Sequence, residues 1–261
     1  MAQNLLAYYC FNDNSATVIK DFSVNEKHLT GANMTIATDS GAIGKVGQFN
    51  GSSSKCTFTD FSSLDALTSF TFITKIKLDV IVGDPVIQII SHRTDNHTLF
   101  VNTDGKIVFS MVADAGYIFT DTRILSINTW YTIIIKWDGA TLKIYLDLLD
   151  SPFSDTATGT MLSNANDLIL GSDLIDWFDG QMEMISYYNR AITDAEIVTL
   201  LEQPAGLKYI AIDDKLGTGD LLLNNFGGKE VVTWYEEFDE RNFSDAEEHL
   251  FKDEEQMMFH N

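Results

Sequence analysis

The chain has 261 residues, of which 45% are hydrophobic, and its 38 acidic and 17 basic residues give a formal charge of −21. This length suits one large domain with an appendage or two small domains, and the hydrophobic share supports a substantial core. The negative field repels nucleic-acid phosphate, and no segment of about 18 uninterrupted apolar residues occurs, so we expect neither nucleic-acid binding nor membrane insertion.

The N-terminal segment MAQNLLAYYCFNDNS lacks a basic region followed by an apolar one. We therefore expect synthesis in the cytoplasm without a secretory signal. Cys10 and Cys56 each lie in a strand-like run. Two buried free thiols are the simpler expectation, and one disulfide is the alternative.

From residue 5 to about 190 the chain is a series of short alternating runs separated by Gly, Asn, Asp and Ser. In Ser69–Leu78 most apolar side chains fall on every second residue, which places one face on a core and the other toward water. Asp104-Gly105 and Asp138-Gly139 lie between apolar runs and predict hairpin turns. Many short strands without intervening helices favour an all-β, antiparallel sandwich.

Helix signals occur only late in the chain. Thr193–Glu196 reads as a capping box followed by an apolar stripe that Pro204 ends. We therefore expect a sandwich domain over residues 1–204 and an acidic C-terminal extension over 205–261. The extension holds 14 acidic and 5 basic residues, and a second capping box at Ser244–Glu247 predicts a terminal helix. We expect an apolar stripe on this helix to dock on another subunit or, in the alternative, on the sandwich of the same chain; its residues are Phe251, Met257 and Met258.

Four segments of the chain carry motifs of a known domain type, in the same order. They are Tyr9–Asn12 with Asp21–Asn25, Gly44–Gly51, Trp130–Asp147 and Phe178–Ile197. The set resembles laminin-G-like domains. This resemblance implies a two-sheet antiparallel jelly-roll sandwich of the concanavalin A type. The extension lies outside the resemblance, and its own residues predict a short mixed appendage. The same fold carries lectins, glucanases, adhesion modules and viral spikes or decorations, so it does not imply one activity.

The resemblance also implies a structural calcium ion, which such domains often hold between an acid of the first turn and an acid of the last strand. Asp21 matches the first position and Glu183 the second, where the family usually has Asp. A Glu reaches one methylene farther, and ligation remains compatible with Ca²⁺ distances. In the alternative, Asp21 caps its turn through backbone N–H groups and Glu183 faces solvent or pairs with Arg190.

Aromatic residues are candidates for stacking on sugar rings. Trp177 lies in a polar loop beside Asp176 and Asp179, and we expect these three residues, with Tyr117 as a further candidate, to bind a glycan. In the alternative, Trp177 packs inward beneath the final helix. Trp130 and Trp137 lie in alternating apolar runs, and we expect both in the core.

No Glu-x-Asp-x-(x)-Glu run of the glucanase type lies in residues 60–190, so we expect no enzyme activity. The first functional expectation is a non-catalytic binding or structural module. It would act at a virion surface, such as that of a bacteriophage, docking on neighbouring subunits or on a second copy of itself. The second is a carbohydrate-binding lectin or adhesin, and the third is a glycoside hydrolase.

Overall fold

The computed structural model describes residues 4–12, 15–42, 44–81, 87–92, 97–162, 167–197, 223–226 and 229–232. The chain divides into two compact units, Met1–Ile212 and Asp213–Asn261. The predicted domain boundary at residue 204 lies outside the described residues, and so does the predicted terminal helix with its docking residues Phe251, Met257 and Met258.

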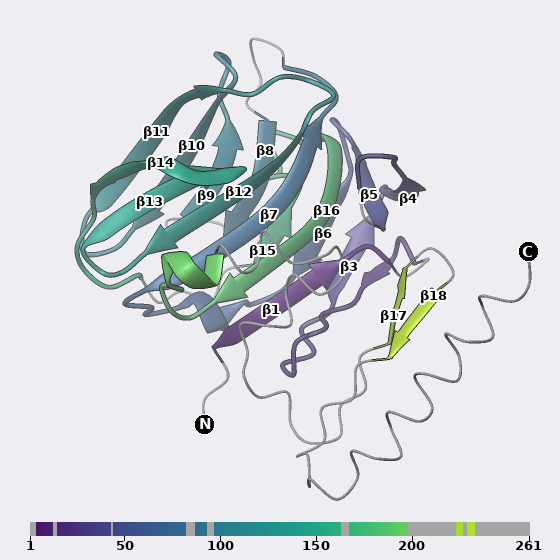
Figure 1. The fold of residues 1–261 in the computed structure, drawn as a ribbon, viewed down its shortest axis with the longest axis horizontal. Coiled ribbons are helices and arrows are strands. Elements are labelled where there is room, and N and C mark those ends of the chain that lie inside the picture. The colour runs from purple at the N-terminus through teal and green to yellow at the C-terminus, as the bar shows by residue number, and fades with distance from the viewer. Residues whose placement is uncertain are drawn as a thin grey trace, which may run out of the picture. The chain divides into compact units, whose positions relative to one another are not determined.

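Eight described strands form one antiparallel sheet, called sheet A (Figure 1). They are β1 (Leu5–Cys10), β4 (Thr35–Thr38), β5 (Lys45–Asn50), β7 (Phe70–Leu78), β12 (Trp130–Trp137), β13 (Thr141–Leu146), β14 (Leu148–Thr156) and β16 (Asp179–Tyr188). The order is β14-β13-β12-β7-β16-β5-β4. The first half of β16 pairs with β5 and its second half with β1, while β7 runs along its other side.

A second antiparallel sheet, called sheet B, also has eight described strands. They are β2 (Val18–Ile19), β3 (Leu29–Ala32), β6 (Lys55–Phe58), β8 (Ile87–His92), β9 (His97–Val101), β10 (Lys106–Val112), β11 (Gly116–Ile124) and β15 (Leu168–Leu170). Their order is β11-β10-β9-β8-β15-β6-β3-β2. A 3₁₀ turn, η1 (Ser62–Leu64), follows β6. The second unit contains a described hairpin of β17 (Leu223–Phe226) and β18 (Lys229–Val232).

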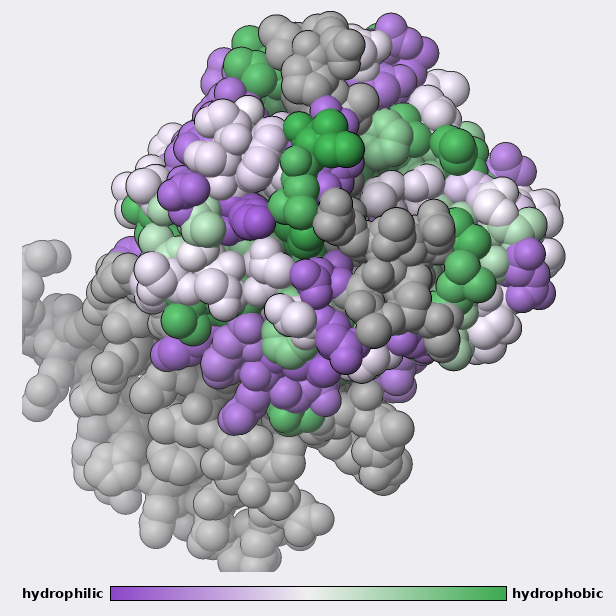
Figure 2. All heavy atoms as spheres, turned by 180° about the vertical axis from the view of Figure 1, so that it is seen from behind, coloured by the Kyte–Doolittle hydropathy of each residue, from purple (hydrophilic) through white to green (hydrophobic). Residues whose placement is uncertain are grey.

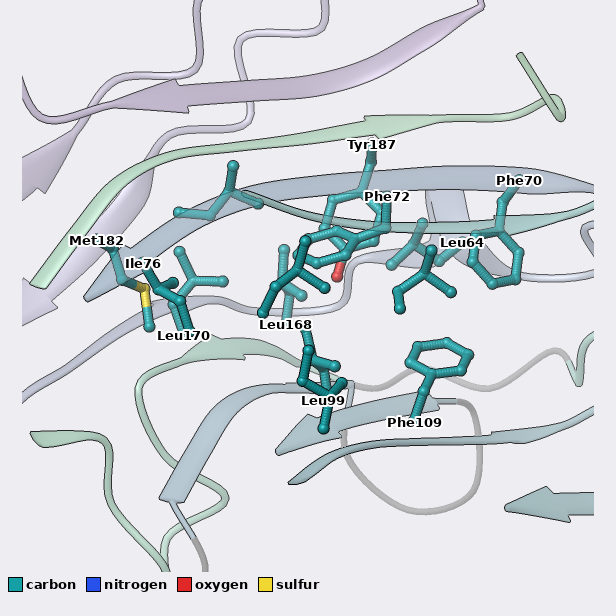
Figure 3. Packing of buried hydrophobic residues seen from close by; sticks show 14 of the residues in the cluster. Leu64, Phe70, Phe72, Ile76, Leu99, Phe109, Leu168, Leu170, Met182 and Tyr187 are labelled. Atoms are coloured by element: carbon teal, nitrogen blue, oxygen red, sulfur yellow. The ribbon is translucent and has the colours of Figure 1, made fainter. Parts of the chain in front are cut away.

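The main hydrophobic core lies between the two sheets (Figure 3). Phe70, Phe72 and Ile76 come from β7 of sheet A, and they face Leu99 and Phe109 from sheet B. All five side chains are at most 2% exposed. The predicted all-β antiparallel sandwich is therefore confirmed, with apolar side chains of both layers packed against each other.

Both predicted Asp-Gly turns join hairpins. β9 pairs with β10 and β12 with β13, and the turn glycines Gly105 and Gly139 have φ of +78° and +89°. Glycine suits both turns because this left-handed region is costly for residues that carry a Cβ. Cys10 and Cys56 are buried free thiols, which confirms the simpler of the two sequence expectations.

One helical turn, 194–197, packs on the outer face of sheet A, which is the face directed away from the core. Ile192 and Ile197 belong to a second hydrophobic cluster there, with Ile73, Ile134, Tyr145, Met184 and Tyr188. The predicted capping box is present, because the Thr193 N–H donates to Glu196 Oε2 at 2.6 Å and the Glu196 N–H donates to Thr193 Oγ1 at 3.2 Å. This turn therefore covers one end of the outer face and leaves the other end to polar residues.

Replacing Thr193 with alanine is expected to lower the free energy of unfolding by about 1 kcal/mol, since the Glu196 N–H loses its acceptor. Chemical denaturation measures this change. Thr193→Ser keeps the hydroxyl and should stay close to the wild type. Equal losses in both variants would contradict the capping role.

Candidate functional site

The polar end of the outer face is formed by strands β5, β7 and β16. Phe178 and Met182 belong to the core, so alternation directs Asp179 and Gln181 to the opposite, outer face. Gln181 lies opposite Gln48 of β5. On the other side, the N–H of Asp79, at the end of β7, donates to the Asp179 carbonyl at 3.1 Å. We call Gln48, Asp79, Asp179 and Gln181 the outer-face cluster.

A directed relay of hydrogen bonds links three of these side chains. Gln181 Nε2 donates to Gln48 Oε1 at 2.7 Å, and Gln48 Nε2 donates to Asp79 Oδ2 at 2.9 Å. An ionised carboxylate only accepts hydrogen bonds, so Asp79 fixes the direction of the relay. Gln181 is 9% exposed, and its Oε1 is buried without a hydrogen-bond partner. A buried acceptor of this kind needs a donor.

The two carboxylates of the cluster interact electrostatically. Partial burial, together with the nearby negative charge of Asp79, raises the pKa of Asp179 above its ordinary value. The cluster therefore combines acceptor groups that repel one another and favours a ligand that brings donors. Within the part of the chain that the structure describes, no group of three or more His, Cys, Asp or Glu side chains could hold a metal ion.

A second polar group adjoins this cluster on the same face. Trp130 Nε1 donates to Asp39 Oδ1 at 2.9 Å, and Lys77 Nζ pairs with Asp39 Oδ2 at 2.5 Å. The ammonium groups of Lys75 and Lys77 lie 5.3 and 5.6 Å from the centre of the Trp130 ring. Lys75 also pairs with Glu183 at 2.5 Å. Bonds from Lys77 and Trp130 lower the pKa of Asp39 to about 2.

The expectation that Trp130 lies in the core is wrong, because Trp130 is half-buried on the outer face. Trp137, on the same strand, is fully buried in the core. The two residues are seven positions apart, and an odd separation along a strand puts side chains on opposite faces. This spacing is the sequence signal that would have placed Trp130 outside.

The loop that contains Trp177 leads directly into the outer-face cluster. Phe178 is fully buried against Phe49, with ring centres 5.6 Å apart, while Trp177 and Asp179 on either side of it are half-buried. Trp177 forms an isolated bridge with Ser172, just before β16 begins at Asp179. The hydrophobic cluster beneath the described turn 194–197 does not include Trp177.

Hydrogen bonds within the loop hold it in shape. Asp173 Oδ1 accepts from the N–H groups of Ile175 and Asp176, at 2.9 and 2.7 Å. Asp176 is half-buried in this turn. Ile175 is 79% exposed at its tip. The structure thus places Asp179 in the cluster, with Trp177 two residues before it in the loop and Asp176 in the adjoining turn.

Tyr117 lies elsewhere, on the edge strand β11 of sheet B. Its hydroxyl donates to the Thr158 carbonyl at 3.1 Å, and its ring stacks on Phe119 at 6.0 Å. Three strands separate β11 from β15, which precedes the Trp177 loop, so four strand spacings put them roughly 19 Å apart. The structure does not bring Tyr117 together with Trp177.

On the side of the molecule turned away in Figure 1, apolar residues gather in several separate groups among polar ones (Figure 2).

Asp21 and Glu183, the predicted calcium ligands, have other partners. Asp21 is buried, and its carboxylate accepts from the N–H groups of Tyr8, Ser23 and Lys27 and from the Ser23 hydroxyl, all at 2.8–2.9 Å. Four donors occupy the acceptor positions that a carboxylate has. Glu183 pairs with Lys75. As arranged, the two residues do not fit a shared calcium site, because an ion would have to displace these bonds.

Calorimetric melting in calcium and then in chelator tests whether the chain binds a calcium ion. The saturated hydrogen bonding of Asp21 leads us to expect the same melting temperature in both buffers. A midpoint raised by several degrees in calcium would show that an ion replaces this arrangement.

The structure also bears on membrane crossing. Among the described residues, no helix is both long enough and apolar enough to span a bilayer.

Sequence comparison identifies one family. The family model described as the concanavalin A-like lectin/glucanases superfamily matches residues 50–198. A search of curated proteins found no match.

Solved structures share the fold at low sequence identity. Domain 4 of AbnA, an extracellular arabinanase from Geobacillus stearothermophilus, was solved with arabinotriose; it is 19% identical with a TM-score of 0.61, covering 78% of this chain and 100% of that domain. The binding domain of botulinum neurotoxin DC in complex with SialylT is 12% identical with a TM-score of 0.59, covering 76% and 51%. Trypanosoma rangeli sialidase in complex with sialic acid is 14% identical with a TM-score of 0.55, covering 76% and 32%. The chain thus spans about half of the neurotoxin structure and a third of the sialidase.

Proposed function

Because the chain belongs to the concanavalin A-like lectin/glucanases superfamily, we propose that it is a non-catalytic carbohydrate-binding module. The sugar binds on the outer face of sheet A, at the cluster of Gln48, Asp79, Asp179 and Gln181. Trp177, two residues before Asp179 in the loop that leads into this strand, offers an aromatic ring for stacking.

The observation that carries the proposal is the unpaired Oε1 of Gln181. It is buried and has no hydrogen-bond partner, while the amide N–H of the same side chain donates to Gln48. Sugars present several hydroxyl groups that donate to such acceptors and an apolar ring face that packs on an aromatic side chain. The arabinanase domain, which is covered over its full length, was solved with arabinotriose, and this supports a carbohydrate ligand here.

A glycan array tests the proposal. The wild-type chain is expected to retain at least one oligosaccharide, and arabinotriose is included because the arabinanase domain was solved with it. Gln181→Leu keeps a similar volume without the acceptor and is expected to lose that retention. Asp155→Asn, at an exposed position of β14, serves as the control and should bind like the wild type. Equal retention by all three proteins would contradict binding at the outer-face cluster. If the wild-type chain retained no oligosaccharide, carbohydrate binding itself would be contradicted.

Glycoside hydrolysis is a second candidate, and one observation favours it. Asp79 and Asp179 are neighbours on adjacent strands, and a raised pKa of the kind seen at Asp179 suits a general acid. Against it, Asp79 Oδ2 is already bound by Gln48. The two functions are separated by incubating the protein with the oligosaccharides that it retains on the array and measuring whether new reducing ends form. We expect binding without product.

Docking on neighbouring subunits of a virion, or on a second copy of the chain, stays a prediction. It rests on the acidic extension 205–261, whose 14 acidic and 5 basic residues suit a basic partner surface. Light scattering of the full chain measures self-association, and mass spectrometry of purified particles detects incorporation. A monomer that is absent from particles would contradict it.

A further inference from the structure

We infer that the outer-face cluster selects neutral glycans over acidic ones. This inference rests on the proposed function and adds the chemical class of the ligand. Asp79, Asp179 and the Gln181 carbonyl are all acceptors, so the ligand groups that face them must be donors. A hydroxyl meets that requirement, and the carboxylate of a uronic or sialic acid does not.

The charges around the cluster strengthen the selection. The Asp179 carboxylate already sits against the negative charge of Asp79, and a third carboxylate from a ligand would add repulsion in a partly buried place. The nearest described cations on this face are Lys75 and Lys77. Each is engaged, with Lys77 paired to Asp39 and Lys75 to Glu183, so an acidic sugar would have to break an existing ion pair to reach them.

The geometry also indicates how the hydroxyl groups are read. Asp179 and Gln181 are two residues apart on one face of β16, so their side chains project side by side. Adjacent hydroxyl groups of one sugar ring can donate to both, one to the Asp179 carboxylate and the other to the Gln181 carbonyl. A carboxylate substituent at either place would oppose an acceptor.

Matched oligosaccharides test the inference. Galactotriose and trigalacturonic acid differ only in a CH₂OH or carboxylate group on each ring, and lactose and sialyllactose form a second pair. In calorimetric titration we expect the neutral member that binds to do so at least about tenfold more tightly than its acidic counterpart. Asp179→Asn should narrow this ratio, whereas Asp155→Asn, which removes the same charge from an exposed site on β14, should leave it unchanged.

Each other outcome contradicts a different part of the account. Acidic members that bind as tightly as neutral ones would overturn the inference while leaving carbohydrate binding intact. A ratio narrowed equally by Asp155→Asn would assign the selection to overall charge and overturn it as well. Binding abolished by chelator would place a cation between the carboxylates and overturn the reading of hydroxyl donors. If the protein bound neither neutral nor acidic glycans, the proposed function itself would be contradicted.

Discussion

Replacing Trp137 with alanine is expected to lower the free energy of unfolding by about 3–5 kcal/mol, the cost of removing a large aromatic side chain from a packed core. Trp137 is fully buried between the sheets, and its ring lies 5.7 Å from that of Phe70. Its Nε1 donates to the Ala157 carbonyl at 2.6 Å. Alanine leaves a cavity and a buried carbonyl without its donor, and denaturant titration measures the loss.

Trp130 provides a matched control, because it lies on the same strand and faces outward. Trp130→Ala removes the same atoms from a half-buried place and is expected to cost less than half as much. Trp137→Phe, which keeps an aromatic ring, should fold if the alanine variant does not. Equal losses at positions 130 and 137 would contradict the assignment of the two faces.

Replacing Asp179 with asparagine is expected to weaken glycan binding by about 10- to 100-fold, because a hydrogen bond to a charged group contributes roughly 1.5–3 kcal/mol. The same change should raise the melting temperature at neutral pH. Burial and the charge of Asp79 hold the folded-state pKa of Asp179 above its unfolded value, so the ionised group disfavours folding. This penalty is fully present above the folded pKa, shrinks as the pH falls below it, and is gone below the unfolded pKa.

Calorimetric titration and thermal melting over a pH series measure both effects on the same variant. The difference in melting temperature between wild type and Asp179→Asn should shrink as the pH is lowered. Asp155→Asn should bind the glycan like the wild type and should have the melting temperature of the wild type at each pH. If Asp179→Asn were less stable than the wild type at neutral pH and bound the glycan normally, both expected effects of the Asp179 carboxylate would be contradicted.

Local patterns in the sequence predicted much of the fold. The alternation in Ser69–Leu78 and the Asp-Gly turns identify strands and hairpins, because they depend on residues that are close along the chain. The capping box at Thr193–Glu196 is local for the same reason. The sandwich follows from these elements, because the apolar face of each sheet is buried by packing against the apolar face of another sheet.

The outer-face cluster could not be predicted in the same way. Gln48, Asp79 and Gln181 come from three strands far apart in the chain, and only the register between β5, β16 and β7 brings them together. That register includes a bulge between Met182 and Met184, and no pattern in the sequence predicts this bulge. Asp179 was predicted from its place beside Trp177, whereas its partner Asp79 was not.

Glu183 shows how the same bulge affects a predicted site. Both Glu183 and Met184 face outward around it, and Glu183 meets Lys75 of β7. The sequence suggested that Glu183 shares a calcium ion with Asp21 or, in the alternative, that it faces solvent or pairs with Arg190. Arg190 instead pairs with Glu196 at the capping box. Charge patterns along one strand therefore do not reveal which cross-strand partner a carboxylate will find.

The most direct test of the account is nuclear magnetic resonance of the ¹⁵N-labelled chain, titrated with a neutral oligosaccharide retained on the array. Side-chain amides of glutamine give their own signals, so Gln48 and Gln181 report on the cluster itself. We predict saturable shifts of both amides, with the Trp177 indole shifting alongside them. Saturable binding that moves signals of β11 around Tyr117 and leaves Gln48 and Gln181 unchanged would contradict the account.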